Sequence, residues 1–388
     1  MAFEPDTVRA ADDEVRRRWA SLTHDGSRLA FPVPHRYVGA GGFFDWLFYW
    51  DSYFIVLGLT SHGLAEVAGE VVDSLLLELE AFGFVPNFNS PDAVCLSRSQ
   101  PPLLTAMIGE VAASRDLEWL AWAAEVAGRE YESFWCAPPR VTLLGLSRYA
   151  DDGSPCPTVP DTPHHRVVAE SGWDNTPRFG DDATDVVAVD LNALLHRYEL
   201  DLASFAALLG RDGAVWRRRA TERRSRLDRI LWRDGRYVDV AASTAEPVDG
   251  APRCLAAFVP LWAGAASPAQ AAATRALLPL FEHDHGLVTC EEGWPDGTEH
   301  NYPVGWAYSH WFTVDGLRRY GYADDATRIA RKWVQLVADR YRETGEFWER
   351  YDVVNSDRDV AGRYTTQSGF GWTNGVHAAL VARVPGLV

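Results

Sequence analysis

Two acidic residues stand in irregular segments that are rich in aromatic side chains. Asp174 ends the run Glu-Ser-Gly-Trp-Asp (170–174), and Glu349 lies between Trp348 and Tyr351. Aromatic neighbours restrict water around a carboxyl group and so influence its protonation. Cleavage of a glycosidic bond requires such a pair, because one carboxyl protonates the leaving oxygen while the other activates water or attacks carbon. The alternative is that Asp174 is an ordinary turn residue.

An aromatic run precedes a third acidic residue, Asp51. Residues 43–50 read Phe-Phe-Asp-Trp-Leu-Phe-Tyr-Trp and show no helical period. Asp51 stands where it could cap the following helix or lie in its first turn. So many rings before a helix start favour a wall around a flat ligand such as a sugar. The alternative is a helix cap packed among core aromatics.

Helical periodicity dominates the elements that must position these residues. Apolar residues recur three or four positions apart in twelve segments. These segments are residues 7–22, 51–62, 64–82, 101–114, 116–134, 184–198, 201–232, 252–263, 268–281, 304–320, 324–344 and 371–384. The best short strand is 236–240, and many helices are paired by short turns, as at 210–213. We therefore predict an all-α fold, a closed ring of helical hairpins that forms one domain over residues 1–388.

Four long irregular stretches interrupt the predicted helices. They cover residues 84–100, 137–182, 289–303 and 345–369, and all four contain aromatic residues and carboxylates. Long loops within a compact domain usually carry function. We expect the functional residues in these loops and in the aromatic segment before Asp51.

Several motifs of five or more residues follow one another in order between residues 49 and 375. They are Tyr-Trp-Asp-Ser-Tyr-Phe (49–54), Gly-Phe-Val-Pro-Asn (83–87), Ser-Arg-Ser-Gln-Pro-Pro (97–102), Ala-Glu-Ser-Gly-Trp-Asp (169–174), Val-Asp-Leu-Asn-Ala-Leu-Leu (189–195), Tyr-Pro-Val-Gly-Trp-Ala (302–307), Trp-Glu-Arg-Tyr-Asp-Val (348–353) and Gln-Ser-Gly-Phe-Gly-Trp-Thr-Asn-Gly (367–375). This series resembles the trehalases, glycoside hydrolase family 37. It resembles more loosely family 63, which includes mannosylglycerate and glucosylglycerate hydrolases. The resemblance covers nearly the whole chain.

The resemblance implies an (α/α)6 barrel and inverting hydrolysis of an α-glycosidic bond. By motif, Asp174 is expected to be the general acid and Glu349 the general base. Inversion requires their carboxyl groups to stand about 6.5–9.5 Å apart, which leaves room for the attacking water.

The resemblance also implies a set of substrate-binding residues. Carboxylate, amide and guanidinium groups would bond sugar hydroxyls, and rings would cover the apolar sugar face. The set comprises Trp50, Asp51, Asn87, Arg98, Gln100, Arg166, Gly172, Trp306, Trp348, Arg363, Gln367 and Trp372. For Trp306 and Trp372 the alternative is core packing.

Two departures from the trehalase pattern concern substrate-holding positions. The arginine-bearing run before Tyr-Trp-Asp is replaced by Gly-Gly-Phe-Phe-Asp-Trp (41–46), and an acid near the C-terminal glutamine is replaced by Arg363. Both predicted catalytic carboxylates remain, so changed specificity explains the pattern better than a dead enzyme. We expect hydrolysis of a small α-glucoside, with trehalose first. The alternative is a substrate of the glucosylglycerate or mannosylglycerate type, whose carboxylate Arg363 could pair.

Three other classes stay open. A noncatalytic sugar-binding relative would bind the same ligands without turnover. A helical-barrel phosphorylase would need phosphate, and no separate Gly-rich or basic phosphate cradle is visible. A terpenoid-cyclase-like protein would need an Asp-rich metal motif, which residues 181–185 resemble superficially; a cap and acidic first turn explains them better.

Composition narrows the partners. A net charge of −17 excludes bulk electrostatic binding of nucleic acid or anionic membrane. The cysteines at 95, 136, 156, 254 and 290 are odd in number and form no CxxC pair, so we expect free thiols in a reducing compartment. With no apolar segment of signal-peptide length at the N-terminus, we expect a cytoplasmic protein. We expect a small carbohydrate substrate and no cofactor or metal; the oligomeric state stays open.

Overall fold

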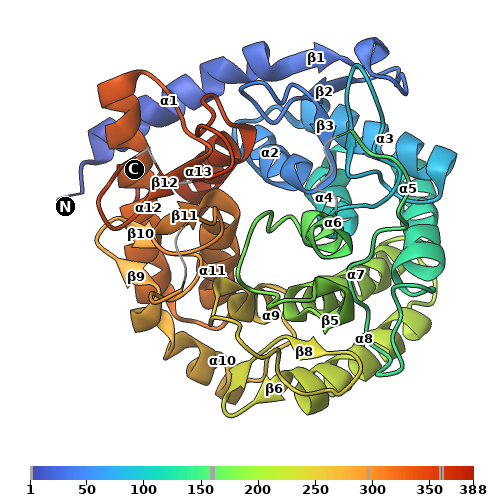
Figure 1. The fold of residues 1–388 in the computed structure, drawn as a ribbon. Coiled ribbons are helices and arrows are strands. Elements are labelled where there is room, and N and C mark those ends of the chain that lie inside the picture. Colours follow the sequence, from blue (N-terminus) through green and yellow to red (C-terminus); the bar gives the residue numbers. More distant parts are fainter. Residues whose placement is uncertain (1–2, 158–161, 295–296, 358–359, 361) are drawn as a thin grey trace.

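The helices of the chain close into a ring (Figure 1). The computed structural model describes residues 3–157, 162–294, 297–357, 360 and 362–388. Its α-helices are α1 (Pro5–Leu22), α2 (Tyr49–Ser61), α3 (Ala65–Phe82), α4 (Leu104–Val111), α5 (Leu117–Glu130), α6 (Pro163–Glu170), α7 (Val189–Leu208), α8 (Ala214–Arg226), α9 (Val259–Trp262), α10 (Pro268–Arg275), α11 (Ala307–Arg319), α12 (Ala323–Thr344) and α13 (Gly371–Arg383). Six of them, α2, α4, α7, α9, α11 and α13, each contact the next, and α13 returns to α2.

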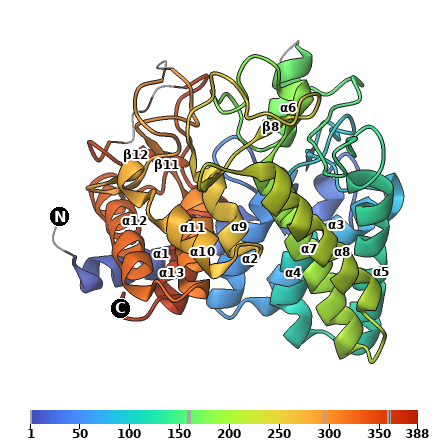
Figure 2. The ribbon, with the colours of Figure 1, turned by 90° about the horizontal axis from the view of Figure 1, so that it is seen from below.

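The other ring is formed by α1, α3, α5, α8, α10 and α12, which lie outside the first six (Figures 1 and 2). Inner helices are buried on nearly all sides, as in α2, whereas outer helices such as α12 bury one face. Two concentric rings of six helices are an (α/α)6 barrel. The predicted all-α barrel is therefore confirmed.

Two glycines allow the ring to close. A methyl group on Gly375 of α13 would stand 1.9 Å from the carbonyl oxygen of Phe54, and one on Gly58 of α2 would stand 2.5 Å from Gly375 Cα. Only glycine lets the two helix backbones approach this closely. Their apolar side chains fill the centre of the core.

Short antiparallel pairs decorate the end of the barrel that carries the long loops, where α6, β8, β11 and β12 lie in Figure 2. The strands are β1 (Thr23–Asp25), β2 (Arg36–Val38), β3 (Leu47–Phe48), β4 (Phe88–Asn89), β5 (Val186–Val187), β6 (Trp232–Arg233), β7 (Arg236–Tyr237), β8 (Val240–Ala241), β9 (Glu282–His283), β10 (Gly286–Leu287), β11 (Val304–Trp306) and β12 (Arg350–Asp352). Two pairs matter most for the site: β3 with β4, and β11 with β12.

The structure differs from the sequence-based elements in several places. Helix α6 lies inside the predicted loop 137–182, where Thr162 caps it and proline occupies its first position. The predicted helix 304–320 begins as β11, and the predicted strand 236–240 is divided between β7 and β8. Residues 158–161, 295–296, 358–359 and 361 of the predicted loops lie outside the described residues.

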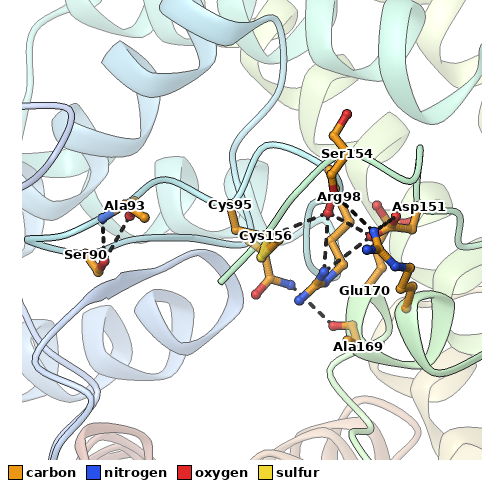
Figure 3. The surroundings of a disulfide bond; sticks show 12 residues. Ser90, Ala93, Cys95, Arg98, Asp151, Ser154, Cys156, Ala169 and Glu170 are labelled. Carbon is orange, nitrogen blue, oxygen red and sulfur yellow. Dashed lines mark hydrogen bonds and ion pairs between the residues drawn. A yellow bond between two sulfur atoms is a disulfide. The ribbon is translucent and has the colours of Figure 1, made fainter. Parts of the chain in front are cut away.

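One prediction about the cysteines is wrong. Cys95 and Cys156 form a disulfide across a sequence separation of 61 residues. It joins the two predicted loops 84–100 and 137–182, close to Arg98 and Asp151 (Figure 3). No local pattern marks such a distant pair, so the sequence gives no signal for it. Cys136, Cys254 and Cys290 are free thiols.

Candidate active site

Two adjoining cavities at the loop end of the barrel bring the predicted catalytic carboxyl groups and Asp51 together. The inner cavity has a volume of ≈ 90 Å³ and is lined by Asp51, Asp174 and Glu349. The outer cavity, of ≈ 270 Å³, shares Asp174 with it. The other residues that line one or both are Ala40, Phe43, Phe44, Trp46, Phe48, Trp50, Asn87, Phe88, Arg98, Gln100, Ala169, Gly172, Glu299, His300, Trp306, Arg363, Tyr364, Phe370 and Trp372. Rings mixed with hydrogen-bonding groups suit a sugar.

Glu349 lies directly before β12, is buried, and accepts hydrogen bonds at both of its oxygens. The Tyr364 hydroxyl donates to Oε1 at 2.5 Å, and Arg350 Nη1 donates to Oε2 at 3.0 Å. Burial raises the pKa of Glu349 to about 7, although Arg350 and the Tyr364 hydrogen bond oppose that rise. A carboxyl with this pKa can exchange protons near neutral pH, as a general base must.

Asp174 has a more open environment. Its side chain is 44% exposed, and Arg363 Nη2 donates to its Oδ2 at 3.2 Å. The same guanidinium donates through Nε to Glu299 at 3.1 Å, and Glu299 is buried. Asp174 and Glu349 therefore differ in burial and in partners, which is the usual way for two carboxyls to take different roles.

Asp51 lies in the first turn of α2 and is buried. Burial is the largest cause that raises its pKa to about 8, and the negative charges of Glu349 and Asp174 act in the same direction. At neutral pH a protonated Asp51 could donate a hydrogen bond to a sugar hydroxyl. The turn is fixed to the loop that follows β4, because the Trp50 N–H donates to Gln100 Oε1 at 3.1 Å.

Tryptophan rings connect the cavity wall to the carboxylate backbone. The rings of Trp306 and Trp372 meet edge to face, with centroids 5.3 Å apart. The Trp372 indole donates to the carbonyl of Glu349, and the Trp306 indole donates to the carbonyl of Glu299, both at 3.0 Å. Each ring is buried and also lines the inner cavity. They are core residues and wall residues at once.

Comparison with known proteins identifies the family. Residues 11–157 and 161–385 match the family model described as Trehalase. The chain belongs to the trehalase family. It is similar to two periplasmic trehalases: one from Xanthomonas oryzae pv. oryzae, 32% identical over 91% of this chain and 69% of the relative, and one from Pseudomonas aeruginosa, 31% identical over 94% and 74%.

A solved structure shows the same relationship. The neutral trehalase from Saccharomyces cerevisiae superimposes with a TM-score of 0.80 at 27% identity, covering 89% of this chain and 73% of the yeast chain. The resemblance to the trehalases and the prediction of a glycoside hydrolase are both confirmed by these matches.

The expected cytoplasmic location is contradicted by the bacterial relatives of this trehalase family member, which are periplasmic proteins. The Cys95–Cys156 disulfide supports the same correction, since such bonds persist in oxidising compartments.

No helix in the described ranges is long and apolar enough to cross a bilayer. Among the same residues, no cluster of three or more His, Cys, Asp or Glu could hold a metal ion.

Most of the residues that the trehalase resemblance assigned to the site line one of the two cavities. Those that do are Trp50, Asp51, Asn87, Arg98, Gln100, Gly172, Asp174, Trp306, Glu349, Arg363 and Trp372. Three do not. Arg166 Nη1 donates to Asp151 at 3.0 Å, and the Trp348 indole donates to Thr344 at 3.2 Å. The Gln367 amide donates to the Thr365 carbonyl at 2.6 Å.

Three polar residues of the cavities were not predicted: Glu299, His300 and Tyr364. The His300 ring stacks on Trp306 with centroids 4.2 Å apart, and its Nδ1 lies 2.8 Å from the Tyr308 hydroxyl. Burial lowers the pKa of His300 well below its usual range, so the ring is neutral. Glu299 and His300 fall in the predicted loop 289–303, and Tyr364 follows Arg363 directly. The only feature of the sequence that could have indicated these three residues is their position in the predicted loops.

Gly172→Ala is expected to damage both stability and activity. Gly172 has a φ of +70°, and an added methyl group would stand 2.6 Å from the Trp50 ring. The left-handed backbone costs about 1 kcal/mol and the overlap with Trp50 about 1–3 kcal/mol more. Thermal unfolding and kcat/KM would be measured. Gly153→Ala is the matched control, because Gly153 has a φ of +82° and open space around it. Equal losses in both variants would contradict a role for the Trp50 contact.

Proposed function

We propose that this protein hydrolyses trehalose with inversion, using Asp174 as the general acid and Glu349 as the general base. The observation that carries the proposal is that both carboxyl groups line one cavity in a chain of the trehalase family. The bacterial relatives are trehalases by name. We also propose that residues 1–388 act as a single catalytic domain, and that it works in the periplasm, as those relatives do.

The proposed reaction uses the different surroundings of the two carboxyl groups. Glu349 takes a proton from a water molecule, which attacks the anomeric carbon of the bound glucose. Asp174 gives its proton to the glycosidic oxygen, so the second glucose leaves as a neutral alcohol. Tyr364 and Arg350 hold the Glu349 oxygens in place and favour the ionised form that accepts the proton, whereas burial favours the protonated form that results.

Arg363 limits how Asp174 can carry its proton during this cycle. Its guanidinium donates to Asp174 Oδ2, the same carboxyl group that has to protonate the leaving oxygen. Either the proton resides on the other oxygen of Asp174, or Arg363 withdraws when the sugar enters. Because Arg363 also bonds Glu299, it retains a partner when it leaves Asp174.

The residues that would bind substrate follow from the lining of the two cavities. Asp51, Gln100 and His300 present polar groups to the glucose that is cleaved, beside the rings of Trp306 and Trp372. Asn87, Arg98 and Arg363 lie in the outer cavity, where the leaving glucose would sit. Arg166, Trp348 and Gln367 are not included, because their side chains are engaged elsewhere.

A glycerate-type leaving group is the less favoured alternative. This hypothesis requires Arg363 to pair with a carboxylate of the substrate. The Arg363 guanidinium already contacts the carboxylates of Asp174 and Glu299. An anionic substrate would have to compete with both. Assays with trehalose, glucosylglycerate, mannosylglycerate, kojibiose and nigerose would rank the substrates. Inactivity on all five, with sugar binding unchanged by Asp174→Asn, would indicate a noncatalytic relative.

Proton NMR of the first products tests the mechanism. Inverting cleavage of trehalose releases one β-glucose from the attacked ring and one α-glucose from the leaving ring. Equal initial amounts of the two anomers are therefore expected. Only α-glucose at early times would show retention and would refute the roles given to Asp174 and Glu349.

Tyr364→Phe is expected to shift the acidic side of the pH–activity profile upward. Glu349 must be ionised to act as a base, so kcat/KM should fall as the pH drops through about 7. The Tyr364 hydrogen bond lowers the pKa of Glu349, and its loss should raise that pKa by about one unit. Tyr320→Phe is the control, because the Tyr320 hydroxyl donates to the Ala266 carbonyl outside the cavities. An unchanged profile in Tyr364→Phe would contradict Glu349 as the base.

A further inference from the structure

Two of the free cysteines face each other across an antiparallel bridge. Cys254 and Cys290 are direct partners in this bridge. The flanking hydrogen bonds run from the Leu255 N–H to the Thr289 carbonyl and from the Glu291 N–H to the Arg253 carbonyl, both at 3.0 Å.

That bonding pattern fixes the spacing of the two cysteines. Because the flanking residues exchange the backbone hydrogen bonds, Cys254 and Cys290 are a non-hydrogen-bonded pair, whose Cα atoms lie about 4.5 Å apart. A disulfide requires a Cα separation of about 4.4–6.8 Å. A disulfide can therefore form here without a change in the distance between the two backbone segments.

The side chains of the pair already interact. Both residues are buried, and the neighbouring Cys254 thiol adds to the effect of burial on the pKa of the Cys290 thiol. Burial raises the pKa of Cys290 well above its usual value, so this thiol is protonated at rest. Cys290 also donates from Sγ to the carbonyl of His300 at 3.3 Å, which links the pair to the loop of the inner cavity.

Cys254 is the more accessible of the two thiols. It lines a separate cavity of ≈ 90 Å³, together with Arg253 and Val248 among others. The side chain of Arg253 is 46% exposed, so this cavity lies at the edge of the protein. Cys290 does not line it and is fully buried. A small reagent therefore meets Cys254 first.

We propose that Cys254 and Cys290 form a second disulfide site, oxidised by exchange with a low-molecular-weight disulfide. The Cys254 thiolate attacks one sulfur of the small disulfide, forming a mixed disulfide and releasing one thiolate. The Cys290 sulfur then attacks the Cys254 sulfur, and the Cys290 proton passes to the second thiolate as it departs. Two electrons pass to the small disulfide, and the two protons lost by the cysteines end on the two released thiols.

The bond would tie the segment around Cys254 to the segment that leads into Glu299 and His300. In the thiol form, the His300 carbonyl accepts from Cys290 and from the Thr176 hydroxyl, the latter at 3.2 Å. Oxidation removes the Cys290 donor and leaves the Thr176 donor. The covalent link then takes over the role of fixing this part of the cavity wall.

Incubation of the native wild-type protein with oxidised glutathione tests the proposal. Remaining thiols are then alkylated under denaturing conditions and counted by intact mass, and peptides are mapped without reduction. The untreated protein has three free thiols, and formation of the disulfide should remove two of them. No glutathione should remain on Cys254. The peptide map should show a pair of peptides that joins Cys254 to Cys290. Cys136→Ala should give the same cross-linked pair.

Two results would overturn the proposal. One is a wild-type protein in which Cys254 keeps glutathione as a mixed disulfide without bonding to Cys290. The other is a protein whose Cys254 and Cys290 both stay reduced while Cys136, which is partly exposed, becomes modified. Cys290→Ala should stop at the mixed disulfide on Cys254. Because the wild-type peptide map decides the question, the test does not depend on whether that variant folds.

Discussion

Glu349→Gln should lower kcat for trehalose by about 10³-fold, within the range that a positioned general base contributes. Glutamine keeps the shape of Glu349 and can still meet Tyr364 and Arg350, so binding should change little. It cannot accept a proton from water. Steady-state kinetics on trehalose would separate kcat from KM, and calorimetry would show whether sugar affinity is retained.

Asp174→Asn is the partner of this experiment and distinguishes acid from base. On trehalose it should lose a similar factor, because the glycosidic oxygen leaves unprotonated. On α-glucosyl fluoride it should retain far more activity, since fluoride departs without an acid, whereas Glu349→Gln should be impaired on both substrates. Equal behaviour of the two variants on the fluoride would contradict the assignment.

Loss of the Cys95–Cys156 disulfide should produce the largest change in stability. Its sequence separation is 61 residues, and closing a loop of that length stabilises the folded state by about 4 kcal/mol in the chain-entropy account. The double variant with alanine at both positions should show that loss in the free energy of unfolding. Its KM should rise too, because the bond anchors the segment that carries Asn87 and Arg98.

Denaturant unfolding without reductant measures the stability effect. Wild-type protein with the disulfide reduced should resemble the double variant. Cys136→Ala is the control for the removal of a thiol that forms no disulfide, and it should stay within about 1 kcal/mol of wild type. A double variant as stable as that control would show that the bond does not constrain the unfolded chain.

The ring of helices was predictable because the inner and outer helices both repeat apolar residues at helical spacing. Helix ends were less so. The segment 201–232 reads as one periodic pattern, but α7 runs through to Leu208 and α8 starts at Ala214 after the Gly210–Gly213 turn. Residues 304–306 fit the helical period as well, yet they pair with β12. Contacts with distant parts of the chain determine where these helices begin and end, and local periodicity does not show such contacts.

The site shows the same limit at the level of single side chains. The motifs located Asp174 and Glu349, but they did not predict which of the neighbouring side chains point into the cavity. Trp348 stands next to Glu349 in extended backbone, where successive side chains point to opposite faces, so only one of them can enter the cavity. Arg166 lies on α6 and turns toward Asp151. Glu299 enters because the Trp306 indole holds its carbonyl and because Arg363, 64 residues further along the chain, holds its carboxylate.

The glycine contact between α13 and α2 has a consequence for how the protein is made. Trp50 comes from the first inner helix and Trp372 from the last, and both line the inner cavity. A ribosome that has released only the first three quarters of the chain has produced neither Glu349 nor the helix that closes the ring. No partial activity can therefore emerge during synthesis. The cavity between the first and last inner helices is therefore complete only after Gly375 has docked against Phe54.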